Sequence, residues 1–78
     1  MIAKDLTQLE AGETGVVVDI HGGYGLAHRL ESLGIRVGKK VTKVSSQLMR
    51  GPVTVRIDSS QVAMGFGTAK KIIVETAN

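Results

Sequence analysis

The chain of 78 residues contains no cysteine, and its only aromatic residues are one tyrosine and one phenylalanine. Without cysteine, the fold cannot be stabilised by disulfides or by a thiolate metal site. Its stability must therefore come from an aliphatic core. Because ordering a chain of this length costs on the order of 100 kcal/mol, we expect nearly every aliphatic side chain to be buried. A deep pocket then has little room, and a shallow surface is the expected functional site.

The shortage of aromatics also restricts the classes of partner. Proteins that bind single-stranded nucleic acids stack the bases on several aromatic side chains, whereas this chain has only Tyr24 and Phe66. The net charge is only +3, and the basic residues are scattered apart from the pairs at 39–40 and 70–71. We therefore predict no nucleic-acid binding. The mild positive charge suits contact with an acidic protein or an anionic membrane face.

Long apolar runs are missing as well. The longest uncharged stretches are of strand length, far below the roughly 20 residues of a membrane-spanning helix. The first residues lack the basic segment and apolar core of a signal peptide. These features predict one cytoplasmic domain over residues 1–78, with no direct insertion into a membrane.

The apolar residues that are present alternate with polar ones in short segments separated by glycines. In the clearest segment, Val53, Val55 and Ile57 point one way, and Thr54 and Arg56 point the other. This alternation is typical of a half-buried strand. Strands are expected at 14–21, 39–45, 53–57, 61–64 and 71–75.

One helix is expected at 26–33, where Leu26, Leu30 and Leu33 form one apolar stripe. Gly34 follows, at the position where a helix end favours a positive φ, and Ile35 can fold back onto the stripe. A further helical turn at Leu6 and Leu9 is expected to cap the core. Five strands, with one helix between the first two, predict a mainly β fold: a small antiparallel barrel that avoids long exposed edges.

Two blocks of sequence are then specific. The first has arginine and leucine at 29–30, leucine, glycine and isoleucine at 33–35, and glycine at 38. The second has glycine, proline and valine at 51–53. With the leucines, glycines and valines around them, these blocks resemble the ferrous iron transport protein A family, FeoA, from the first strand to the last. One departure is Val37, at a position where the family often has proline.

The resemblance implies an SH3-like barrel. It also implies a partner, the membrane ferrous-iron transporter FeoB, whose cytoplasmic part carries a GTP-binding domain. Related domains occur in metal-dependent transcriptional repressors, but the chain has no room for a helix-turn-helix beside the barrel. We therefore expect an accessory of iron uptake that binds a partner and has neither catalytic activity nor a cofactor.

Three residues are weak candidates for a metal site. Asp19 and His21 share one face of the first expected strand, and His28 follows on the helix. Imidazole and carboxylate groups suit Fe²⁺, Zn²⁺ or Ni²⁺, but no motif fixes their geometry. A metal sensor or carrier is therefore kept as an alternative function.

Arg29 flanks the apolar stripe of the expected helix. Its side chain could cover the barrel mouth and bind carbonyl or carboxylate groups. Alternatively, it could act as an arginine finger for a GTPase partner. We favour the structural role and keep Arg29 among the partner-binding candidates.

The leading interface candidates are Leu48, Met49 and Arg50, in the segment before Pro52. Loop tips are normally polar, so two large aliphatic side chains there suit a partner or a plug for the barrel end. If Val17 and Ile73 point outward on their strands, they extend this patch and favour weak self-association.

Overall fold

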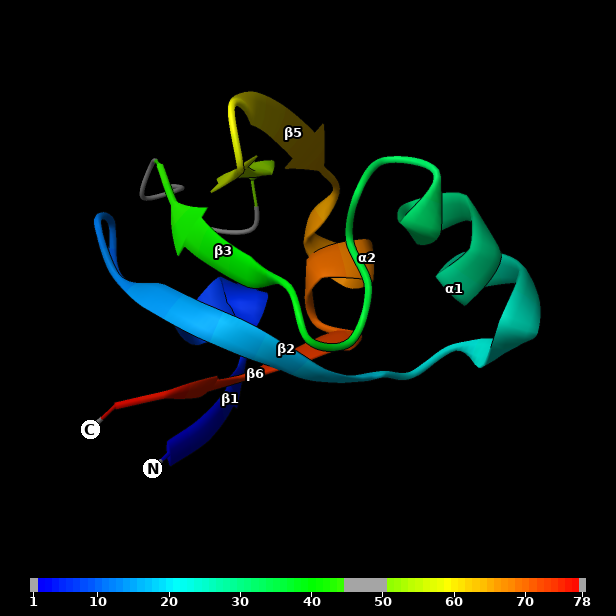
Figure 1. The fold of residues 1–78 in the computed structure, drawn as a ribbon, viewed down its shortest axis with the longest axis horizontal. Helices are drawn as coiled ribbons and strands as arrows, with labels where there is room; N and C mark the ends of the chain where they lie inside the picture. The colour runs from blue at the N-terminus through cyan, green and yellow to red at the C-terminus, as the bar shows by residue number, and fades with distance from the viewer. Residues whose placement is uncertain (1, 45–50, 78) are drawn as a thin grey trace.

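The computed structural model describes residues 2–44 and 51–77. Within these residues, six strands form one sheet in the order β1-β6-β2-β3-β4-β5 (Figure 1). Every neighbouring pair is antiparallel. The strands are β1 (Ile2–Asp5), β2 (Thr14–Ile20), β3 (Lys40–Lys43), β4 (Val53–Ile57), β5 (Ser60–Met64) and β6 (Ile72–Thr76). The predicted mainly β fold is confirmed.

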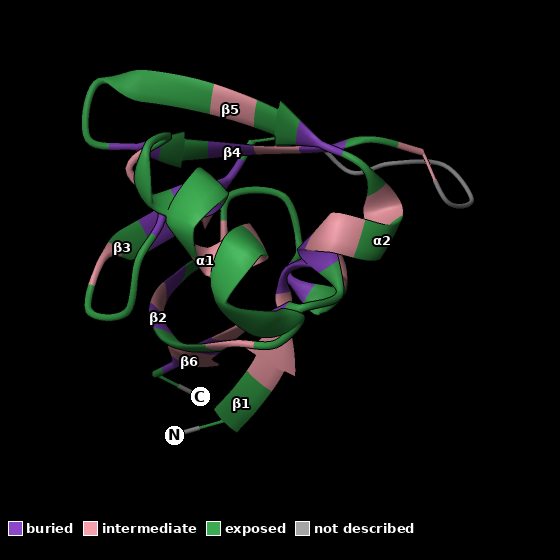
Figure 2. Cartoon of the chain, turned by 90° about the vertical axis from the view of Figure 1, so that its right-hand side faces the viewer, coloured by how far each residue is buried: buried purple, intermediate pink, exposed green. Residues whose placement is uncertain are grey.

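The sheet curls around its core. Figure 2 shows β4 and β5 at one end of the molecule and β1 and β6 at the other, joined through β2 and β3. The three extents of the molecule are nearly equal, at 27, 26 and 23 Å. No helix within the described residues is long and apolar enough to cross a membrane. The buried apolar side chains are Leu6, Leu9, Val17, Leu30, Ile35, Val41, Val53, Val55, Ile57, Met64, Ala69, Ile72 and Val74.

The first strand, β1, is absent from the five predicted strands. It pairs along its whole length with the last strand, from Ile2 opposite Thr76 to Asp5 opposite Ile73. The 3-10 helix η1 (Leu6–Gln8) follows directly, and Leu6 and Leu9 are buried as expected. Asp5 caps this turn by accepting a hydrogen bond from the Thr7 amide, while Gln8 accepts one from the Asp5 amide.

The prediction that Val17 points outward is wrong. Its side chain is only 1% exposed, whereas that of Val18 is 38% exposed. The pairing of β2 with β6 contains a register shift between Val17 and Asp19. Three consecutive valines leave the inward face of the strand undefined by sequence, and a shift of one residue exchanges the two faces. Ile73, by contrast, is half-buried.

The helix α1 (Gly23–Glu31) lies between β2 and β3, as predicted, but begins and ends earlier than 26–33. Leu30 is buried and Leu26 is partly buried against the core. Leu33 lies beyond the helix and is 48% exposed, so its place in the apolar stripe was wrong. Gly34 has a φ of +93°, and the amide of the fully buried Ile35 donates to the Leu30 carbonyl at 2.9 Å. The predicted positive φ at Gly34 and the return of Ile35 to the core are therefore confirmed, although the helix itself ends at Glu31.

Candidate functional site

The sequence-predicted site residues fall in different parts of the fold. Leu48, Met49 and Arg50 lie outside the described residues, in the chain segment between β3 and β4. Arg29 lies on the exposed side of α1. Its carbonyl accepts a hydrogen bond from the Ser32 hydroxyl at 2.6 Å. Across residues 2–44 and 51–77, its guanidinium takes part in no ion pair.

The three metal candidates do not form one group. The Nε2 atom of His21 lies 3.0 Å from Oδ2 of Asp19, and both side chains are 61% exposed. The His28 ring stacks instead on Tyr24, with ring centroids 6.2 Å apart and planes inclined by 12°. In the part of the chain that the structure describes, no three histidine, aspartate or glutamate side chains are grouped closely enough to hold a metal ion.

A groove of about 270 Å³ lies along α1. The helix and the segment 36–37 line it, together with Ile20 at the end of β2. Two of the lining side chains are largely exposed, Tyr24 at 86% and Val37 at 61%. The lining consists of Ile20, Tyr24, Ala27, His28, Glu31, Arg36 and Val37.

Backbone hydrogen bonds fix the segment 36–37 against β2. The Gly38 amide donates to the Val17 carbonyl at 2.8 Å, and the Val17 amide donates to the Lys39 carbonyl at 2.9 Å. Ile35, at 0% exposure, anchors the other end of the segment in the core. The groove is therefore built on fixed backbone, and such pre-organisation lowers the entropic cost of binding.

A glycine in the left-handed region precedes α1. Gly22 has a φ of +101°, and a Cβ atom there would lie 2.8 Å from a Leu26 methyl and 3.0 Å from the Lys71 side chain. Both atoms belong to flexible side chains that can move, so it is the positive φ of the turn that favours glycine here. This turn places Tyr24 on the groove. The sequence offered one signal for it, an aromatic residue inside a run of glycines.

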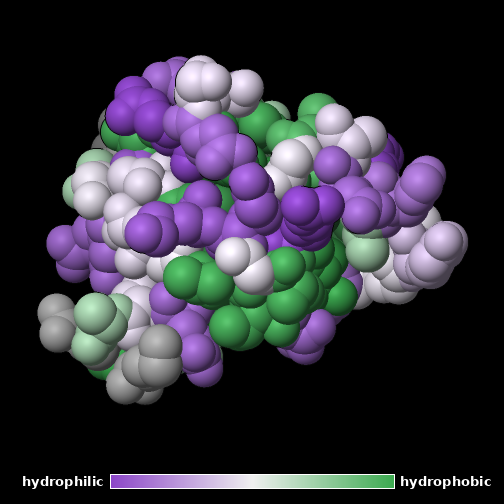
Figure 3. All heavy atoms as spheres, viewed as in Figure 1, coloured by the Kyte–Doolittle hydropathy of each residue, from purple (hydrophilic) through white to green (hydrophobic). Residues whose placement is uncertain are grey.

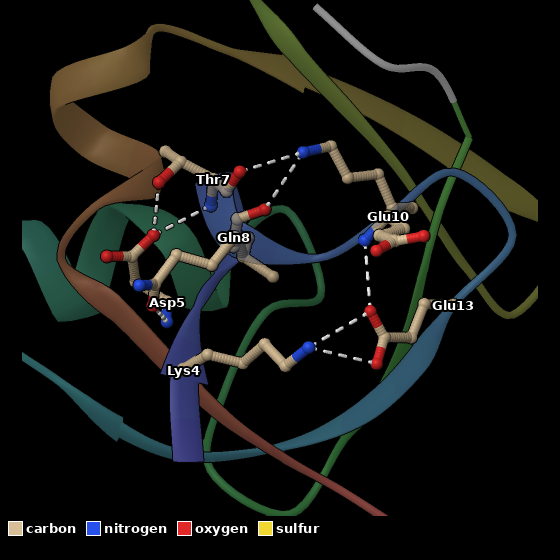
Figure 4. A network of polar contacts seen from close by, with 8 residues as sticks. Lys4, Asp5, Thr7, Gln8, Glu10 and Glu13 are labelled. Carbon is tan, nitrogen blue, oxygen red and sulfur yellow. Dashed lines mark hydrogen bonds and ion pairs between the residues drawn. The ribbon is translucent and has the colours of Figure 1, made fainter. Parts of the chain in front are cut away.

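A network of polar contacts joins η1 to the neighbouring strands (Figure 4). The Lys43 side chain is only 2% exposed, and its Nζ donates to the carbonyls of Leu6 and Thr7 at 3.2 Å each. Burial lowers the pKa of Lys43, and the charge of Asp5 opposes that shift. The buried ammonium group therefore fixes η1 against β3, which is a structural role.

Glu13 closes the same network on its exposed side. Its carboxylate accepts hydrogen bonds from the Glu10 amide at 3.0 Å and from the Lys4 ammonium, whose Nζ lies 3.2 Å from Oε2. These two contacts, the Glu10 amide first, lower the pKa of Glu13 below 4.5. The hydrogen bond from the Glu10 amide and the ion pair with Lys4 both favour the ionised form of the Glu13 carboxylate at neutral pH.

An apolar region also lies on the outer face of the sheet. Figure 3 shows hydrophobic side chains gathered over β2 and its neighbour β6. Val18, on β2, is 38% exposed. Weak self-association through this face stays a prediction.

Comparison with known proteins identifies the family to which this chain belongs. The FeoA domain model matches residues 4–76. A protein of Methanocaldococcus jannaschii, provisionally named Fe(2+) transport protein A, is 41% identical over 66 residues, covering 85% of this chain and 78% of that protein. A solved structure called an iron uptake regulatory protein, FeoA, has a TM-score of 0.85 at 27% identity, covering 96% of this chain and 97% of the other.

Two further solved structures show where the fold recurs. FeoA of Stenotrophomonas maltophilia, solved with zinc and described as an SH3-domain protein, has a TM-score of 0.76 at 25% identity, covering 91% and 88% of the two chains. A manganese-dependent transcriptional repressor has a TM-score of 0.85 at 27% identity, covering 95% of this chain and 41% of the repressor. The predicted SH3-like fold is confirmed, and this chain belongs to the FeoA family.

Proposed function

We propose that this protein is a cytoplasmic accessory of ferrous-iron uptake that binds the cytoplasmic region of an FeoB-type membrane transporter. The observation that carries the proposal is the match to the FeoA domain over residues 4–76. The 41% identity to a relative provisionally named for Fe(2+) transport supports it. Binding to the transporter would change its activity or its assembly.

The surface of the molecule supports a binding role. Arg29 is exposed on α1 and is in no ion pair among the described residues, so its guanidinium is available to a partner. On the transporter it would meet carboxylate or phosphate groups, which its planar donors match. The sequence adds Leu48, Met49 and Arg50 as the apolar and basic contacts of the same interaction.

A direct binding measurement tests this function. The purified cytoplasmic region of the transporter is titrated with the wild-type protein and with a variant in which residues 48–50 are replaced by glycine and serine. We expect the wild type to bind and the variant to lose binding, while its melting temperature stays nearly unchanged. Equal binding by both would reject the role of residues 48–50, and no binding by the wild type would reject the function itself.

A docking role of Arg29 can be distinguished from a catalytic one, because the cytoplasmic part of the proposed partner carries a GTP-binding domain. An arginine that stabilises the transition state for hydrolysis raises the rate by roughly 10³ or more. If Arg29 only contributes to docking, Arg29→Ala weakens binding, and GTP hydrolysis recovers at saturating protein. If it acts as a finger, Arg29→Ala binds normally but does not stimulate hydrolysis, and Arg29→Lys recovers little of the rate.

The second candidate function is metal sensing. The similarity to a manganese-dependent repressor favours it, as does the contact between His21 and Asp19. A sensor predicts stoichiometric, tight Fe²⁺ binding under anaerobic calorimetry that is lost when His21→Ala and His28→Ala are combined. We expect weak binding at most, because two ligands rarely hold a divalent ion against water.

A further inference from the structure

The groove along α1 has charges of opposite sign on its two sides. Glu31 stands on the helix side, and Arg36 stands on the facing segment. Both residues are exposed, and no ion pair within 4.0 Å joins them to each other or to another described residue. The two charges are therefore available to groups brought by another molecule.

The base of the groove is apolar. Ile20 and Ala27 are partly buried, and Val37 stands at the rim with 61% of its surface exposed. The stacked rings of Tyr24 and His28 form the wall on the helix side. A volume of about 270 Å³ is below the usual 300–1,000 Å³ of a site for a drug-sized molecule. It suits one or two inserted side chains of a polypeptide.

The geometry points to a polypeptide occupant: a segment of the transporter's cytoplasmic region that inserts one aliphatic side chain between an acidic and a basic residue. The aliphatic group would lie on Ile20 and Ala27, and Val37 would cover it. The acidic residue would pair with Arg36 and the basic one with Glu31. This inference rests on the proposed function, since it names the chemistry of the partner segment, and it adds a contact separate from residues 48–50.

Charge complementarity decides the occupant. An acidic segment without a basic residue would place a negative charge against Glu31. A basic segment without an acidic residue would place a positive charge against Arg36. A purely apolar segment would leave both charges partly desolvated and unpaired. Only a segment with both signs, one on each side of its apolar anchor, satisfies the two walls together.

Two charge reversals and one charge introduced at an apolar residue test the inference. Arg36→Glu, Glu31→Lys and Val37→Asp are titrated against the purified cytoplasmic region of the transporter. Each is expected to weaken binding by roughly tenfold or more, as for charges that meet across an interface. Arg56→Glu is the matched control, because Arg56 is an exposed arginine on β4 and does not line the groove. It should change binding less than about twofold.

A photo-crosslinker in place of Tyr24 identifies the occupant, with circular dichroism as the check that each variant folds. Mass spectrometry of the product should return a transporter peptide with an aliphatic residue between an acid and a base. If the wild type binds the transporter but the groove variants bind equally well, the groove inference is overturned and the proposed function stands. If the wild type does not bind, both fall. A cross-link to a peptide without that pattern also overturns the inference.

Discussion

The ammonium nitrogen of Lys43 lies 3.2 Å from the carbonyl oxygen of Leu6, inside the protein and 37 positions away along the chain. A charged group there pays for its removal from water with hydrogen bonds to backbone carbonyls. Burial disfavours the charged form and lowers the pKa of Lys43, and the charge of Asp5 only partly opposes this shift. The burial of Lys43 therefore makes the free energy of unfolding change with pH in the alkaline range.

Lys43→Met should remove that dependence. The folded protein holds the Lys43 proton less tightly than the unfolded chain, whose pKa lies near 10.5. As the pH rises from the lowered folded-state pKa to that value, the unfolded state binds more protons, and the free energy of unfolding increases. Urea denaturation at several alkaline pH values measures the slope. Lys70→Met, at an exposed lysine, is the control and should keep it.

Glu13→Gln should weaken the protein at neutral pH and less so in acid. The pKa of Glu13 is lowered in the folded state, so its contribution is fully present above 4.5 and is lost as the pH falls through the lowered value. Wild type and variant should therefore converge in unfolding free energy in strong acid. Glu75→Gln serves as a comparison, because Glu75 is in no ion pair among the described residues. A constant difference at all pH values would contradict the assignment.

Two glycine substitutions should have opposite signs. At Gly34, φ is +93° and the nearest atom to an added Cβ would be 3.8 Å away, so alanine meets backbone strain without a clash. Gly34→Ala should cost about 1 kcal/mol of unfolding free energy. Gly25→Ala, inside α1 and with open space around the added carbon, should gain about 0.5–1 kcal/mol. Thermal unfolding of both variants measures the difference.

The inward face of β2 can be tested with two neighbouring valines. Val17→Ala removes two methyl groups from a side chain that is 1% exposed, and should cost about 2 kcal/mol. Val18→Ala, at 38% exposure, should cost less than about 0.5 kcal/mol. Chemical denaturation of both variants gives the comparison. The reverse order of the two costs would mean that Val18, and not Val17, faces the core.

The sequence predicted the elements whose signals are local. Leu6 and Leu9 mark a helical turn, and Gly34 with Ile35 marks a helix end, because the spacing of two or three residues decides these features. β1 has no such signal. It is four residues long and half exposed, and it exists as a strand because β6, about 70 positions further along the chain, pairs with it.

The groove was missed for a similar reason. Arg36 and Val37 become a wall only because hydrogen bonds between Gly38 and Val17 hold that segment against β2. The local sequence around residue 36 does not predict the hydrogen bond between Gly38 and Val17. From the sequence, Leu48 and Met49 were instead selected for their apolar character. An apolar side chain indicates that some surface buries it, but the sequence does not say whether that surface belongs to the protein or to a partner.

The pairing of Ile2 with Thr76 has a consequence for how this fold is used. The two ends of the domain leave the sheet side by side (Figure 1). A chain with adjacent ends can be spliced into a larger polypeptide, or cut and rejoined as a circular permutant, with little strain on the connections. A unit of this kind can therefore be joined into a multidomain chain without a change to the sheet.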